Sequence, residues 1–129
     1  METREYVTLF VLIATIISSH LLASKQTRKN KKAKWIEDLR LEVANLISLS
    51  QQVTKDVNTL FPFSKSGFVV AMLLDQNKKL QEDLILEVQD FGLFVTTGFN
   101  LSQITEYKDR VTKITNLTKY IIFQEEKRL

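Results

Sequence analysis

The chain begins with a long stretch that carries no formal charge. Residues 6–24, between Glu5 and Lys25, are apolar around the whole circumference of a helix rather than along one stripe. A helix of this length rises about 28 Å, at about 1.5 Å per residue, which matches the hydrocarbon thickness of a bilayer. The pattern predicts a transmembrane helix, within an N-terminal anchor that comprises residues 1–24.

A cleaved signal peptide and a buried core helix are the two alternatives to a membrane span. A signal peptide starts with a positive region, whereas Glu2 and Glu5 here outnumber Arg4. The small-residue pattern at a cleavage site is poorly matched by residues 21–23. No later segment is apolar enough to surround a buried helix of this kind, so we expect a span.

A basic linker follows the anchor at residues 25–34. It contains six basic residues and no acidic one: Lys25, Arg28, Lys29, Lys31, Lys32 and Lys34. Because Arg4 alone precedes the span, the positive-inside rule places the N-terminus outside and residues 25–129 in the cytoplasm, at the inner (plasma) membrane. We expect the six side chains to bind anionic lipid head groups, at about 1 kcal/mol each. A nucleic-acid tether, the alternative, would need interleaved aromatic residues or a folded groove.

After the linker, apolar residues recur at alternating intervals of three and four. Seven of the eight positions in this series are apolar: Ile36, Leu39, Val43, Leu46, Ser50, Val53, Val57 and Leu60. Such a seam predicts one helix over residues 35–60. Pro62 disfavours the helical conformation at the residue before it, so we expect a break at residues 61–67.

Two further helices are predicted beyond the break. One covers residues 68–95, with a possible kink at 75–77 and a turn at 96–100 after it. The last helix is expected to be capped by Asn100 or Ser102, and positions three and four apart form its stripe: Ile104, Tyr107, Val111, Ile114, Thr118 and Ile121. The expected fold is therefore all-α: an N-terminal transmembrane helix followed by a cytoplasmic antiparallel helical bundle or coiled coil of about three helices, residues 35–129. Each apolar stripe needs a partner, either in the same chain or in a second copy.

Charge and composition exclude several functions. The net charge of +3 comes from the linker, because residues 35–129 hold 11 basic and 13 acidic residues, so we expect no direct nucleic-acid binding by this domain. The chain has no cysteine, which excludes disulfides, thiol nucleophiles and cysteine-ligated metals. Its only histidine, His20, lies in the predicted span. We therefore expect no catalytic residue, no cofactor and no metal site.

An enzyme is possible only if acidic side chains converge on a pocket. An enzymatic function would require Asp75, Glu82 or Asp90 to share a cavity with Arg40. The simpler interpretation of the acidic residues between 82 and 90 is a solvated helix face.

The most distinctive local sequence is Trp-Ile-Glu-Asp-Leu-Arg at residues 35–40. Trp35 is placed to pack on the end of the bundle or to enter the lipid head-group layer, and Arg40 to bridge to an acid on a neighbouring helix. We expect contact with a protein partner or a homo-oligomer through helical faces. The candidate interaction residues are Trp35, Ile36, Leu39, Arg40, Val43 and Leu46.

An N-terminal span, a basic linker and the motif Trp-Ile-x-x-Leu-Arg together resemble a group of small bacterial single-pass membrane proteins. The closing segment, residues 121–128, is also similar to that of the group. Some members are membrane effectors in retron and other phage-defence cassettes. The resemblance implies an effector that a partner holds silent and that permeabilises the inner membrane upon release.

Such an effector would associate through its span, in which small and polar residues share one helix face. The candidate membrane contact face consists of Thr15, Ser18, Ser19 and Leu22. The alternative function is a structural or adaptor tether, or an accessory subunit, in which the span is only an anchor.

Overall fold

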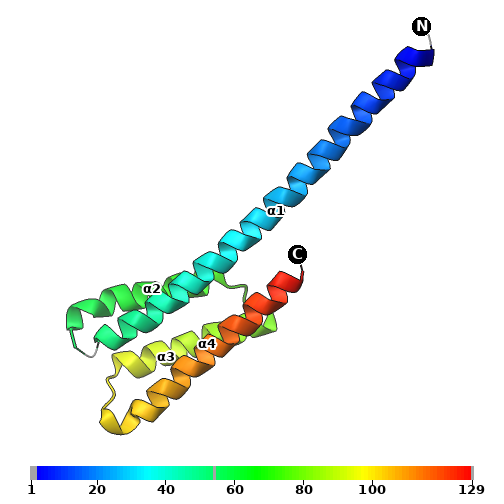
Figure 1. Cartoon of the computed structure of the whole chain (residues 1–129). Coiled ribbons are helices and arrows are strands. Elements are labelled where there is room, and N and C mark those ends of the chain that lie inside the picture. Colours follow the sequence, from blue (N-terminus) through cyan, green and yellow to red (C-terminus); the bar gives the residue numbers. More distant parts are fainter. Residues whose placement is uncertain (1–2, 54, 129) are drawn as a thin grey trace. The chain divides into compact units, whose positions relative to one another are not determined.

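The computed structural model describes residues 3–53 and 55–128 (Figure 1). Within the first helix, the side chains at positions 3–12, 18, 20–22 and 25 lie outside the described part. The described residues form four α-helices and two short 3-10 helices, and no strand occurs among them. The prediction of an all-α fold is confirmed. In order, the elements are α1 (Thr3–Val53), η1 (Val57–Thr59), α2 (Leu60–Leu73), α3 (Lys79–Thr96), η2 (Leu101–Gln103) and α4 (Ile104–Lys127).

The chain forms two compact units, Met1–Lys34 and Trp35–Leu129. The first unit is the N-terminal part of α1, and it includes residues 25–34, which the sequence predicts only as a linker. These ten residues contain no Gly or Pro and are rich in lysine and arginine, which favour the helix. The basic segment is therefore a continuous stretch of helix.

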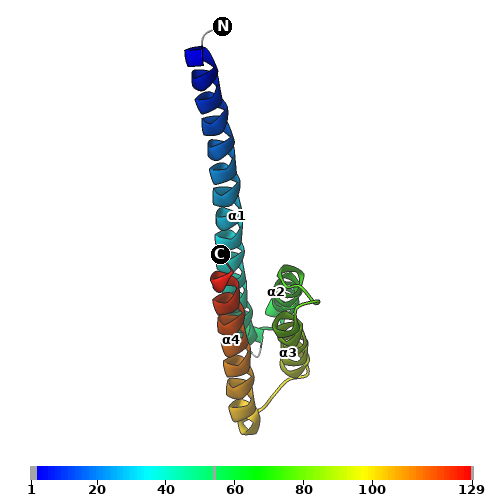
Figure 2. The ribbon, with the colours of Figure 1, turned by 90° about the vertical axis from the view of Figure 1, so that its right-hand side faces the viewer.

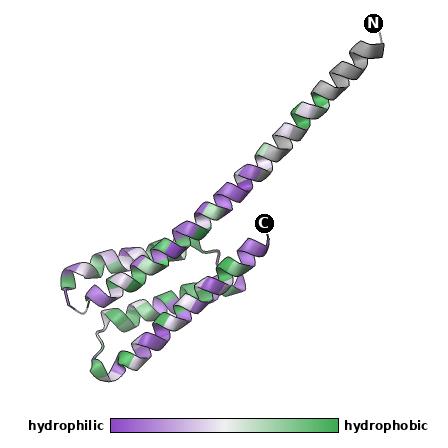
Figure 3. Ribbon diagram, viewed as in Figure 1, coloured by the Kyte–Doolittle hydropathy of each residue, from purple (hydrophilic) through white to green (hydrophobic). Residues whose placement is uncertain are grey.

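The apolar stretch of residues 6–24 is also helical. In the part of the chain that the structure describes, no helix is long and apolar enough to cross a membrane. Most side chains of the predicted span lie outside the described residues, as the grey ribbon in Figure 3 indicates. Of those that are described, Ile13, Ile16 and Ile17 are exposed. The span stays a prediction.

The second unit is a bundle of four antiparallel helices, one more than the sequence predicts. Residues 35–53 of α1 pair with α2, and α3 pairs with α4, with neighbouring helices running in opposite directions (Figures 1 and 2). The bundle closes within one chain, because all four helices contribute to a single core. The buried apolar residues are Ile36, Leu39, Val43, Leu46, Phe63, Val70, Leu74, Leu84, Val88, Phe91, Val95, Ile114, Ile121 and Ile122.

The first helix ends at Val53, whereas the sequence predicts that it continues to Leu60. The amides of Lys55 and Asp56 both donate to the carbonyl of Gln52, at 2.9 Å, and so close the last turn. The Asp56 side chain then caps η1 by accepting from the Asn58 amide at 3.0 Å. The apolar seam continues in sequence after Val53 but not in space, and Val57 is 79% exposed.

The predicted break around Pro62 is wrong, because this proline lies inside α2. It is the third residue of the helix, where its missing N–H would have no intrahelical partner in any case. The break between α1 and α2 lies before this proline, between Val53 and Leu60, and a second break lies at residues 74–78, where the sequence predicts only a possible kink within one long helix. There the Asp75 carboxylate accepts from the Asn77 amide at 2.9 Å, which forms a local turn that competes with the helix.

The turn between α3 and α4 agrees with the prediction. Gly98 adopts a φ of 79°, a conformation that other residues rarely tolerate, directly after the end of α3. Asn100 then forms a capping box with Gln103 at the start of η2, which α4 follows without interruption. These local signals end α3 and reverse the chain, so that α4 runs antiparallel to α3.

A pair of hydroxyl groups joins α1 to α4 inside the bundle. Ser50 is fully buried, and its Oγ donates to the Ile47 carbonyl at 2.5 Å and lies 2.7 Å from the Tyr107 hydroxyl. Because Ser50 has a single hydroxyl hydrogen, Tyr107 is the donor of the bond between the helices. The polar position in the apolar seam thus makes a specific contact.

We expect Ser50→Val to lower the free energy of unfolding by about 1–2 kcal/mol, because it leaves the Tyr107 hydroxyl without its acceptor. Tyr107→Phe is expected to cost about 1 kcal/mol, and the double variant less than the two single effects together. Urea denaturation of all four proteins measures this coupling. Thr118→Val is the control, since the Thr118 hydroxyl bonds only within its own helix, to Ile114. Strict additivity of Ser50→Val and Tyr107→Phe would contradict the assignment.

Candidate interaction surface and polar cavity

Four of the six predicted interaction residues lie in the core of the bundle. Ile36, Leu39, Val43 and Leu46 are between 0 and 6% exposed. Their partners are α2, α3 and α4 of the same chain; the Cδ1 of Leu46, for example, lies 3.6 Å from where a Cβ on Gly67 would be. These side chains hold the bundle together, and another protein could reach them only by opening it.

The other two predicted residues, Trp35 and Arg40, lie at the edge of the bundle. The indole N–H of Trp35 donates to the carbonyl of Leu73 at 2.7 Å. This carbonyl belongs to the last turn of α2 and has no partner within its helix. Arg40 forms an ion pair with Glu126 of α4 at 3.7 Å, but both side chains are about half exposed, so the pair contributes little to stability. Trp35 therefore fixes the end of α2 against α1.

The residues predicted to contact the membrane belong to the first unit. Arg28, Lys29, Lys31 and Lys34 are exposed and Lys32 is half-buried, whereas the side chain of Lys25 lies outside the described residues. On the proposed contact face, the same holds for Ser18 and Leu22, while Thr15 and Ser19 are exposed. Lipid binding and span association by these residues stay predictions.

A set of large apolar side chains remains exposed on the outward faces of α2 and α3. On α2, they occur at spacings of seven and four, and on α3 at a spacing of seven, so each set follows one helix face. Apart from Lys65, α2 carries no charge, and most of its ribbon is coloured apolar in Figure 3. We call this set the α2–α3 surface: Phe61 (77% exposed), Phe68 (67%), Met72 (72%), Leu86 (49%) and Leu93 (66%).

Exposed apolar side chains of this size on neighbouring helices are typical of contact sites. The sequence does not separate them from core residues, because α2 is apolar on nearly every side. Only the positions of the buried residues Phe63, Ser66 and Val70 reveal that Phe61 and Phe68 point outward.

Two of the four acidic residues of α3, Asp83 and Glu87, form ion pairs at the surface. Asp83 accepts from Lys79 at 2.9 Å and Glu87 from Lys113 at 2.7 Å. These hydrogen bonds, together with the negative charge of the partners, raise the pKa of Lys79 and of Lys113 above the usual value for lysine. Among the described residues, no group of three or more His, Asp or Glu side chains is arranged to hold a metal ion.

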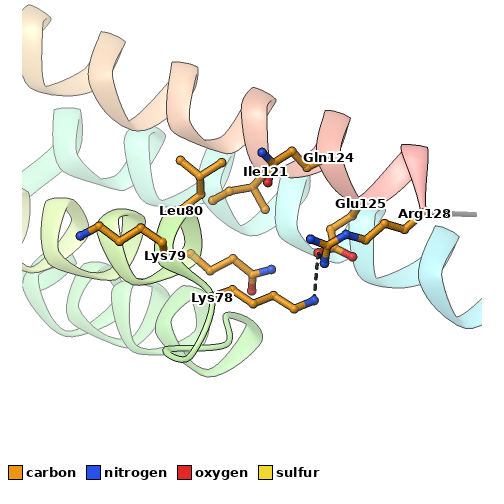
Figure 4. A pocket seen from close by; sticks show the side chains of 8 residues that line it. Lys78, Lys79, Leu80, Ile121, Gln124, Glu125 and Arg128 are labelled. Atoms are coloured by element: carbon orange, nitrogen blue, oxygen red, sulfur yellow. Dashed lines mark hydrogen bonds and ion pairs between the residues drawn. The ribbon is translucent and has the colours of Figure 1, made fainter.

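A polar cavity of about 290 Å³ lies between the first turn of α3 and the last turns of α4 (Figure 4). Glu125 in its wall is a carboxylate only 8% exposed, and it accepts from Lys78 at 2.9 Å and from Arg128 at 3.4 Å. Figure 4 shows the ammonium group of Lys79 directed away from this cluster. The lining consists of Lys78, Lys79, Leu80, Gln81, Ile121, Gln124, Glu125 and Arg128. The lining includes none of the acidic residues, Asp75, Glu82 and Asp90, that the hypothesis of an enzyme requires in a shared cavity.

Gln81 is the most buried polar residue of this lining, at 3% exposure. Its side-chain oxygen accepts from the Asp75 amide at 2.7 Å. Because a backbone N–H can only donate, the atom that faces the Asp75 amide is the side-chain oxygen of Gln81, and this bond ties the first turn of α3 to the turn that precedes it.

The sequence does not predict this cavity, although one signal for it exists. Gln81 and Glu125 both stand at positions that continue an apolar stripe, three residues before Leu84 and four after Ile121. A polar residue at such a position indicates a buried polar contact, but its partner lies on another helix. Comparison with family models, with curated proteins and with solved structures finds no match to this chain.

Proposed function

We propose that the chain is a membrane-anchored helical interaction protein, with a single span at residues 6–24, the N-terminus outside and residues 25–129 in the cytoplasm. The uncharged stretch and the basic segment after it support the anchor. The observation that carries the interaction role is the α2–α3 surface, whose five large apolar side chains stay exposed after the bundle has closed its own core. Its partner is another protein or a second copy of the chain.

The specific activity that we propose is that of an anti-phage defence effector, which perturbs the inner membrane when a partner releases it. The resemblance at residues 35–40 supports this activity. In this proposal the bundle receives the signal through the α2–α3 surface, and the span acts on the bilayer. A structural tether without toxic activity is the second candidate, and the closed, well-satisfied bundle is compatible with it, since no buried polar side-chain atom among the described residues lacks a hydrogen-bond partner.

Inducible expression in a bacterium tests the proposal, with growth and propidium iodide entry as readouts. We expect the full chain to stop growth and admit the dye, and a truncated chain of residues 25–129 to do neither. The double variant Phe61→Ser/Phe68→Ser is expected to lose the activity, because assembly through the α2–α3 surface is weakened. Leu101→Ser is the matched control, since Leu101 is 86% exposed but lies outside that surface.

Two outcomes would contradict the proposal. If the full chain reaches the membrane and neither stops growth nor admits dye, spontaneous membrane damage is excluded and the tether gains support. If the truncated chain is as toxic as the full chain, the span is not the active part.

A further inference from the structure

We propose that the α2–α3 surface binds a second copy of the chain, so that α2 of each copy packs against α3 of the other. This inference rests on the proposed function, because it names the partner of the surface on which that function depends. Three observations support it: the register of α2 and α3, the places of two opposite charges at the edges of the surface, and the end of the bundle at which the chain enters it.

The first observation is the register of α2 and α3, which lie next to each other and run in opposite directions (Figures 1 and 2). A Cβ on Gly67 of α2 would lie 3.7 Å from Cγ1 of Val88 of α3, so these two positions are level along the bundle. Because both helices rise by the same amount per residue, each step forward on α2 corresponds to one step back on α3. Lys65 is therefore level with Asp90.

A two-fold axis parallel to the helices keeps these levels when it brings a second copy onto the surface. In Figure 2, α2 and α3 form one layer of the bundle, and α1 and α4 form the other. When two α2–α3 layers meet about this axis, α2 of one copy faces α3 of the other, again antiparallel. By the same register, Phe68 then lies at nearly the level of Leu86 of the second copy, and Phe61 at nearly that of Leu93. The exposed apolar side chains thus cover each other in pairs.

The second observation is the place of Lys65 and Asp90 at the two outer edges of the surface. On α2, Lys65 is turned from the apolar line toward the side of Ser66, whose hydroxyl bonds to α1. On α3, Asp90 is turned from the apolar line toward the side of Glu87, which pairs with Lys113 of α4. Both side chains are exposed, and in the described part of the chain neither takes part in an ion pair.

The two-fold axis brings these two charges together between the copies. Within one chain they lie on opposite edges of the surface. The rotation carries the α3 edge of the second copy over the α2 edge of the first, at the same level. Lys65 of each copy therefore meets Asp90 of the other, and this pair of opposite charges occurs twice at the rim of the interface. Because Lys65 is the only charged residue of α2, the contact between α2 and the acidic α3 is complementary in charge.

The third observation concerns Trp35, at which the chain enters the bundle, and it disfavours the other two-fold arrangement. An axis across the helices would pair α2 with α2 and α3 with α3, so that the exposed Glu82 and Asp90 would face the same acidic surface of the second copy. It would also place the two copies of Trp35 at opposite ends of the dimer. An axis along the helices leaves both at one end, as two chains that are anchored in one membrane require.

Cysteine cross-linking of the full chain in maltoside micelles tests this arrangement, because the chain has no cysteine of its own. Copies with Lys65→Cys and one affinity tag are mixed with copies that carry Asp90→Cys and a second tag, and a short bis-maleimide is added. We expect a cross-linked product that contains both tags. Lys119→Cys, in place of either variant, is the control: Lys119 is exposed on α4, outside the surface, and we expect little product from it.

Charge reversal then tests the contact between the two edges. Lys65→Glu and Asp90→Lys each place like charges opposite each other twice in the dimer, and we expect each to weaken dimerisation about tenfold or more at low salt. The double variant restores opposite charges with their order exchanged, and we expect its dimerisation to lie within about threefold of that of the unchanged chain. Energy transfer between two fluorescently labelled populations, followed on dilution into excess micelles, measures the dimer. Recovery in the double variant also shows that the single variants do not merely fail to fold.

Three results would overturn the proposal: cross-linking of Lys65→Cys to itself but not to Asp90→Cys, no product from chains that remain helical, or no recovery in the double variant. Failure here is distinct from failure of the proposed function. If cross-linking fails while Phe61→Ser/Phe68→Ser abolishes growth arrest, the surface binds a different protein and the effector stands. If cross-linking succeeds while the full chain does not stop growth, the dimer stands and the effector is excluded.

Discussion

Replacing Phe91 with alanine is expected to lower the free energy of unfolding of the bundle by about 3–5 kcal/mol. Phe91 is fully buried on α3, and its ring meets Phe63 of α2 edge-on, with centroids 6.1 Å apart, and Tyr107 of α4 at 5.8 Å. One side chain thus joins three helices. Its removal opens a cavity that the rigid neighbouring rings cannot fill, and the loss is a large part of the roughly 5–15 kcal/mol that stabilises a domain.

The measurement is urea denaturation of the full chain in micelles, followed by the fluorescence of Trp35. This is the only tryptophan of the chain, and its contact with Leu73 makes it a reporter of the bundle. Phe123→Ala is the matched control, because Phe123 is 55% exposed on α4, and we expect it to cost less than about 1 kcal/mol. Similar losses in the two variants would contradict the assignment of Phe91 to the centre of the core.

The helical faces that form the core could be predicted from the sequence. Leu39, Val43 and Leu46 on α1 and Ile114 and Ile121 on α4 were all identified by their spacing, and all are buried. A spacing of three and four residues places side chains on one face of a helix. This is a local property of the sequence, so the buried face can be predicted without knowing which helix packs against it. Which helix covers that face is not a local property, and the number of helices was accordingly underestimated.

The helix ends were harder to predict, because they depend on competition between local bonds. Pro62 suggests a break, yet a proline in the first turn of a helix costs no intrahelical hydrogen bond, because the N–H groups of that turn have no partner within the helix. Asp75 suggests only a kink, yet its carboxylate bonds the Asn77 amide, and Gln81 takes up the Asp75 amide from the next helix. The bond between Gln81 and the Asp75 amide joins α3 to the turn that precedes it, whereas the sequence pattern predicts one continuous helix over both.

The candidate sites show the same division between local and long-range information. Trp35 stands out in the sequence, and its packing on the bundle end is one of the two predicted positions. The α2–α3 surface could not be identified, because Phe61 and Phe63 look alike until the fold buries one of them. The polar cavity requires Lys78 and Glu125, which are far apart in sequence, to be brought within 2.9 Å.

Replacing residues 6–24 by an equal number of leucines is expected to abolish growth arrest and dye entry by the full chain. A leucine helix of this length still spans a bilayer, and the basic segment that orients it is unchanged. It lacks the small and polar side chains through which membrane helices approach closely and hydrogen-bond. An effector whose span assembles in the membrane therefore loses its activity, whereas a tether keeps its anchor.

A second leucine span that retains Thr15, Ser18, Ser19 and Leu22 at their positions separates the contact face from the rest of the sequence. We expect this variant to regain growth arrest and dye entry, because these positions share one face of the helix. Immunoblots of membrane fractions control for equal insertion of both spans. Full toxicity of the plain leucine span would show that the damage does not depend on this face, and the activity would then have to reside in residues 25–129.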